Sequence, residues 1–121
     1  MSDRALIEMA AKAAGLTLHE HFDVHGEYWP WCVELGYNWN PLTDDGDALR
    51  LAVRVDLEVW QGGNMSKCSH DSFLGNIIKE PHTGDVYAST RRAIVRAAAE
   101  IAKSSATGPA SDFTSAEGDA P

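Results

Sequence analysis

The chain has 121 residues, 44% hydrophobic and 23% charged, which fits one globular domain with an ordinary core. Its net charge of -8 argues against direct nucleic-acid binding, which needs clustered lysine and arginine, and no apolar run is long enough to span a membrane. Two cysteines cannot make a disulfide framework, and residues 1–15 lack the apolar segment of a signal peptide, so we expect a cytoplasmic protein.

A helix and a hairpin come first in the chain. Apolar residues recur at helical spacing from Ser2 to Ala14, and Gly15 is a stop signal. The pattern then alternates over Leu16–Val24, which predicts a half-buried strand. The aromatic segment Tyr28–Gly36 predicts the strand that pairs with it.

A second helix and further strands follow. Thr43, Asp44 and Asp45 all suit the first turn of a helix that runs to about residue 55, and the pattern does not decide which of them is the cap. Strands are then predicted over Leu57–Gln61, Met65–His70 and Phe73–Lys79, the first two joined by a turn at residues 62–64.

The last predicted helix spans Val86–Lys103 and is capped by Asp85. After it, residues 104–121 are rich in serine, alanine, glycine, proline and acids, a composition typical of disordered segments. The whole pattern predicts an α+β fold with a single layered domain over residues 1–103. We expect a mostly antiparallel sheet of about four to five strands, three helices packed on it, and a disordered tail.

Two groups of side chains are candidates for binding a cation. The predicted first strand places three histidines and a carboxylate on one face, an arrangement that can reach a divalent metal: His19, His21, Asp23 and His25. Polar residues belong on a solvent-facing strand surface in any case, so no metal site is assigned. The acids Asp44, Asp45 and Asp47 lack the ligand spacing of a calcium loop, and helix capping accounts for them.

Arginines and aromatics form the candidate ligand site. Arg91, Arg92 and Arg96 are a local concentration of cations in an acidic chain, and arginine forks suit phosphate or carboxylate. A solvated helix face, or pairing with acids of the middle helix, explains them without any ligand. The aromatic strand offers side chains that would stack on a base or fill a partner's pocket, with one of its two faces in the core: Tyr28, Trp29 and Trp31.

No catalytic signature is present. The chain lacks a phosphate-binding loop, a dinucleotide fingerprint, zinc-finger spacing and the local motifs that mark catalytic serine or cysteine residues. We therefore expect a protein that is not an enzyme and needs no cofactor.

Three segments carry a resemblance to a known family. The stretch Asn40–Val53 (NPLTDDGDALRLAV), together with Ile7–Gly15 and Ala88–Ile101, resembles small phage and prophage proteins of the phage ABA sandwich domain type. The resemblance covers about a third of the chain and implies a phage origin and a layered α/β architecture. It carries no activity onto individual residues.

A phage origin would favour a role against host defence, in the cytoplasm of the infected bacterium. The leading hypothesis is sequestration of a nucleotide-like immune signal in the pocket of an oligomer, with arginines for phosphates and aromatics for a base. The alternative is an inhibitor that binds a host defence protein through its acidic surface, as an anti-CRISPR protein does. A structural or regulatory accessory role is the third hypothesis.

Overall fold

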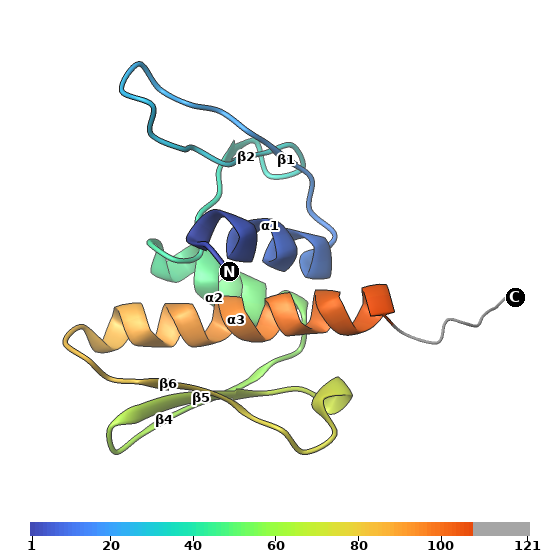
Figure 1. Ribbon diagram of the computed structural model, residues 1–121, viewed down its shortest axis with the longest axis vertical. Helices are drawn as coiled ribbons and strands as arrows, with labels where there is room; N and C mark the ends of the chain where they lie inside the picture. Colours follow the sequence, from blue (N-terminus) through green and yellow to red (C-terminus); the bar gives the residue numbers. More distant parts are fainter. Residues whose placement is uncertain (108–121) are drawn as a thin grey trace, which may run out of the picture.

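The computed structural model describes residues 1–107 and arranges them in three layers. One three-stranded sheet forms an outer layer, three helices form the middle layer, and a second three-stranded sheet forms the opposite outer layer (Figure 1). None of the helices in this described part is long and apolar enough to cross a membrane. The predicted α+β class and the three helices are confirmed.

The first helix, α1 (Asp3–Ala14), has the ends that its sequence predicts. The hydroxyl of Ser2 accepts a hydrogen bond from the backbone N–H of Ala5, at 3.1 Å, which satisfies a donor that the helix itself cannot. Gly15 follows with a left-handed φ of 72°, a conformation that glycine adopts without strain.

The second helix, α2 (Asp45–Arg54), resolves the choice between three possible caps. Asp44 is the N-cap, and its carboxylate accepts a hydrogen bond from the backbone N–H of Asp47, at 2.8 Å. The third helix, α3 (Val86–Thr107), runs past the predicted end at Lys103. The predicted tail therefore begins too early, and its remaining residues, 108–121, lie outside the described residues.

The first sheet consists of three very short antiparallel strands, β1 (Leu18–His19), β2 (Trp31–Cys32) and β3 (Tyr37–Asn38), in the order β1-β2-β3. The predicted pairing of the first two strands is confirmed, but both strands are far shorter than predicted. In the loop between them, Asp23 accepts backbone N–H groups from His25 and Glu27, both at 2.9 Å. Such local hydrogen bonds compete with the hydrogen bonds between strands, and the strands are shorter as a result.

The second sheet is longer and more regular, with the order β4-β5-β6. β4 (Glu58–Gly62) and β5 (Met65–Ser69) form the predicted hairpin, and β6 (Ile78–Pro81) pairs with β5. The strand predicted over Phe73–Lys79 is wrong up to Ile77, because β6 begins at Ile78. Residues Asp71–Phe73 form the 3-10 turn η1, and the next two residues have left-handed φ angles of 53° and 91°, which break a strand.

The predicted single sheet of four to five strands is thus replaced by two separate sheets with helices between them. The core lies where helices meet closely through small side chains, with Ala10, Ala93 and Ala97 fully buried. Trp39, which follows β3 in the chain, is 1% exposed and belongs to the same core. In the second sheet, α3 packs mainly over β5 and β6, where Ser66 and Cys68 are fully buried.

Candidate functional site

The three arginines of α3 each hold an acid or a carbonyl of a different element. Arg91 donates to the Leu42 carbonyl at 2.8 Å and to Asp45 at 2.6 Å, which ties α3 to the start of α2. Arg92 bonds Asp3 of α1 at 2.7 Å. The arginines therefore spread over three directions, and their contacts connect the layers of the fold.

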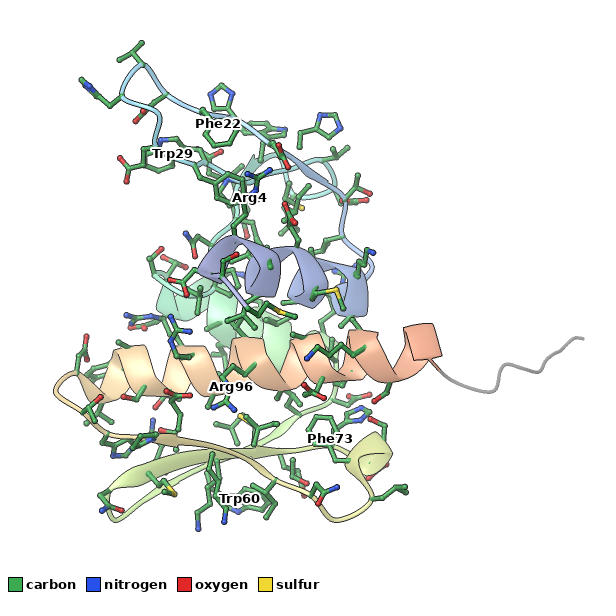
Figure 2. All side chains as sticks on the ribbon, in the orientation of Figure 1. Arg4, Phe22, Trp29, Trp60, Phe73 and Arg96 are labelled. Carbon is green, nitrogen blue, oxygen red and sulfur yellow. The ribbon has the colours of Figure 1, made fainter. Side chains whose placement is uncertain are left out.

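Arg96 reaches the second sheet. It donates to Glu80 at 2.6 Å and to the Lys79 carbonyl at 2.9 Å. Figure 2 shows Arg96 on the side of α3 that faces this sheet and Trp29 beside the first sheet, beyond the helices. The structure does not bring the predicted arginines and aromatics together.

The aromatic residues near the first sheet pack against each other and against α1. The rings of Phe22 and Tyr28 lie 5.7 Å apart, and the Arg4 guanidinium lies 5.2 Å from the centre of the Tyr28 ring. The buried Tyr28 hydroxyl has no hydrogen-bond partner in the part of the chain that the structure describes, and burial raises its pKa. Trp31 is 44% exposed, and the indole of Trp29 donates to Asp23 at 3.2 Å.

A cleft of about 420 Å³ lies between the first sheet and the start of α2. Its most buried polar side chain is Asp47, 3% exposed, which accepts from the Asn40 backbone N–H at 3.0 Å, the Tyr37 hydroxyl at 3.3 Å and Arg50 at 3.0 Å. The bond to Asp47 also raises the pKa of Arg50. This network joins β3 to α2, and its buried acceptor is fully engaged.

The charges of this cleft do not suit a phosphate. The carboxylates of Glu27, Asp44 and Asp47 line it with the single guanidinium of Arg50, which Asp47 and Asp44 already hold at 3.0 and 3.9 Å. Three negative charges against one positive charge repel an anion. Although Tyr28 and Trp29 contribute to its wall, the cleft is a poor site for a nucleotide.

The histidine run does not assemble a metal site. Asp23 is engaged by two backbone N–H groups and the Trp29 indole, and these hydrogen bonds lower its pKa. Among the residues that the structure describes, no group of three or more histidine, cysteine, aspartate or glutamate side chains is placed to hold a metal ion. His19 lies in β1, whereas His21 and His25 lie in the loop after it.

A serine and a histidine meet between α3 and the second sheet. The Ser66 hydroxyl lies 2.7 Å from Nε2 of His82 and 2.8 Å from the Thr90 hydroxyl. Ser66 is fully buried, so it is closed to a substrate and serves as a polar contact within the fold. Burial also raises the pKa of the nearby Cys68 thiol to about 12, which makes it a poor nucleophile.

The outer face of the second sheet carries a row of three side chains of the types that are found in ligand-binding sites. The register pairs Trp60 of β4 with Lys67 of β5, and Lys67 with Lys79 of β6. Directly paired residues of antiparallel strands point to the same face. Because Ser66 and Cys68 point inward to α3, this row points outward.

The two lysines of this row lack counter-ions within residues 1–107. Neither ammonium group forms a hydrogen bond or an ion pair with any side chain in the described part of the chain, whereas all three arginines of α3 do. Like charges that face each other directly across two strands destabilise a sheet by roughly 0.2–1 kcal/mol. The one acid of the strands on this face, Glu58, pairs with Ser69 at its far end.

An aromatic platform lies beside the lysines. Trp60 is 46% exposed, and Figure 2 shows it on the side of the sheet that faces away from the helices. A shallow hollow of about 380 Å³ adjoins it, lined by Trp60, Gln61, Gly62, Lys67 and Ile77. An indole face, an aliphatic wall and two unpaired ammonium groups suit a flat aromatic ligand that carries negative charge.

This site was missed in the sequence because its parts are far apart along the chain. Alternation in the β4–β5 hairpin does place Trp60 and Lys67 opposite the inward residues. Lys79 joins them only through the pairing of β5 with β6, and the sequence pattern ends the predicted strand at that residue.

Comparison with known protein families, with curated proteins and with solved structures finds no match.

Proposed function

We propose that the protein binds a nucleotide-like anion on the outer face of the second sheet and has no catalytic activity of its own. The observation that carries the proposal is the row of Trp60, Lys67 and Lys79. Two like charges face each other there, beside an exposed indole and without a counter-ion among the described residues. The indole would stack on the base, and the two ammonium groups would neutralise phosphate charge.

The charge distribution supports this assignment. The chain carries a net charge of -8, so an anion is repelled from most of its surface and attracted to the lysine row. A polyanionic nucleic acid would meet the surrounding acids as well, which favours a small ligand. Together with the resemblance to phage proteins, this chemistry supports sequestration of a nucleotide-like immune signal in the infected bacterial cell.

Titration calorimetry with a panel of cyclic dinucleotides and ADP-ribose derivatives tests the proposal. We expect at least one ligand to bind, with an affinity that falls as salt concentration rises. The double variant Lys67→Glu/Lys79→Glu should lose at least tenfold in affinity. Lys12→Glu, which reverses a charge on α1, is the matched control and should bind normally. Equal binding by both variants, or no binding of any ligand, would contradict the proposal.

The second candidate function is inhibition of a host defence protein through an acidic surface. The cleft beside the first sheet favours it, because the carboxylates of Glu27, Asp44 and Asp47 outnumber the single guanidinium of Arg50. A positively charged partner would be attracted there. Capture of one host protein by the wild type and by the lysine double variant, but not by Glu27→Lys/Asp44→Lys, would favour this function.

A further inference from the structure

The strand β4 is an open edge of the second sheet. It is the first strand in the order β4-β5-β6, and all five of its residues, Glu58–Gly62, are exposed. Edge strands are usually protected by proline, lysine, bulges or a covering element. The opposite edge strand, β6, contains both Lys79 and Pro81, whereas β4 contains neither residue type and pairs with β5 without a bulge.

The hairpin geometry defines which groups β4 presents. Gly63 and Asn64 form a two-residue turn, so the flanking pair of Gly62 and Met65 exchanges hydrogen bonds. Alternation then directs the backbone groups of Trp60 toward β5 and those of Val59 and Gln61 toward the free edge. The edge therefore offers two residues with free N–H and C=O groups, one on each side of Trp60.

This edge is complementary to itself. In an antiparallel pair related by a two-fold axis at Trp60, Val59 faces Gln61 of the second copy, so the free donors and acceptors meet. Glu58, the only charged residue of β4, faces Gly62 of the second copy, so no like charges are opposed. α3 packs mainly over β5 and β6, so β4 lies at the margin of the helix layer, where Gln61 bonds Thr90 through its side chain and not through its backbone.

We infer that two copies of the chain join through β4 into one six-stranded sheet with a shared ligand site on its outer face. The two Trp60 side chains lie next to each other at the two-fold axis. A Lys67–Lys79 pair flanks them on each side, and the two Lys67 residues are about 14 Å apart across three strand spacings.

The inference rests on the proposed function and narrows the class of ligand that would bind. A site with two indoles and two pairs of ammonium groups around a two-fold axis matches a ligand with two bases and two phosphates in the same symmetry. A cyclic dinucleotide has this chemistry, and one molecule would be held by two chains. A mononucleotide would use only one half of the site and would bind more weakly.

The dimer is tested without any ligand. Sedimentation equilibrium of the full chain should give a dimer, and the variant Trp60→Cys should form a covalent dimer on mild oxidation, because residues that face each other across paired strands suit a disulfide. The two native cysteines are buried and do not compete. Leu74→Cys, at a position 91% exposed outside the strands, is the matched control and should stay largely uncrosslinked. A monomeric wild type, or equal crosslinking of both variants, would overturn the inference.

A second variant tests the pairing of β4 with a second copy separately from the folding of the chain. Val59→Pro removes an N–H that points to the free edge and leaves the pairing with β5 intact. We expect a monomer with an unchanged circular dichroism spectrum and with at least tenfold weaker binding of the cyclic dinucleotide. A folded variant that remains a dimer would show that β4 is not the interface, and the Trp60→Cys result decides the question if this variant does not fold.

Stoichiometry distinguishes the inference from the proposed function. One cyclic dinucleotide per two chains supports both. One ligand per chain, lost in Lys67→Glu/Lys79→Glu, would overturn the shared site and preserve the proposed function. A dimer that binds none of the nucleotides would contradict the proposed function and the ligand, while leaving the β4 interface itself in place.

Discussion

Different interactions stabilise the two sheets of this protein, and only the second sheet carries the side chains that we propose to bind a ligand. The first sheet has strands of two residues each, and side-chain carboxylates stabilise it, with Asp23 in its loop, Glu34 against Thr17 and Asp47 beneath β3. The second sheet has a longer backbone ladder and α3 on its inner face. These interactions lie within the sheet or on its inner face, whereas Trp60, Lys67 and Lys79 lie on its outer face.

The largest effect is expected where the first sheet depends on one buried acid. Asp47→Ala leaves the Asn40 N–H, the Tyr37 hydroxyl and Arg50 without their acceptor, and should lower the free energy of unfolding by about 3 kcal/mol in chemical denaturation. Glu27→Ala is the matched control, since this carboxylate lines the same cleft and forms no side-chain hydrogen bond in the described structure. Equal stability of the two variants would contradict the role of Asp47.

A smaller loss is expected on the inner face of the second sheet. Ser66→Ala removes the hydroxyl that contacts His82 and Thr90 in a fully buried position, and should lower the free energy of unfolding by about 1.5 kcal/mol. Ser69→Ala in the same strand, at a residue on the outer face, should change it by less than about 0.5 kcal/mol. A larger loss for Ser69→Ala would show that the two faces have been assigned the wrong way round.

The carboxylate of Glu34 should make the first sheet sensitive to acid. It accepts the backbone N–H and the hydroxyl of Thr17, both at 2.8 Å, and these bonds lower its pKa from 4.5 to about 2. Because the folded-state pKa is the lower one, the stabilisation is complete above about pH 4.5 and disappears as the pH falls toward 2. Thermal melts should show that the advantage of the wild type over Glu34→Gln shrinks in this range. An advantage that does not depend on pH would contradict the assignment.

The smallest expected effect on the free energy of unfolding is an increase, whereas the preceding variants lower it. Lys79→Gln relieves the facing charges of Lys67 and Lys79 and should raise the free energy of unfolding by about 0.5 kcal/mol while it weakens ligand binding. Lys12→Gln, which removes a cation from the last turn of α1, should not stabilise the protein. A loss of stability in Lys79→Gln would show that Lys79 has a stabilising partner in the fold, which would contradict a binding role for the row.

The helices and the β4–β5 hairpin are predictable because local features determine them. Ser2, Gly15 and Asp44 act on the nearest turn of their own helix, and the turn at Gly63 is encoded beside its strands. The division into two sheets was not predictable, since hydrophobic alternation shows which face of a strand is buried but not which strands pair.

The residues of the candidate site were likewise not predictable from the sequence pattern. A run of three arginines in the sequence attracts attention, yet in space each of them is paired with a different acid. Lys67 and Lys79 form no ion pair among the described residues, and strand pairing alone brings these two single lysines together. Proximity along the chain therefore does not reveal which cations lie without a counter-ion in the described structure.

The four tryptophans provide the most direct test of the central claim, because they report on different regions. Trp29 and Trp31 lie near the first sheet, Trp39 in the core and Trp60 on the outer face of the second sheet. In a two-dimensional NMR titration with a cyclic dinucleotide, we predict that the indole N–H signal of Trp60 shifts most and that the signal of Trp29 does not move. A shift of Trp29 with an unchanged Trp60 signal would place the ligand at the first sheet and contradict the account.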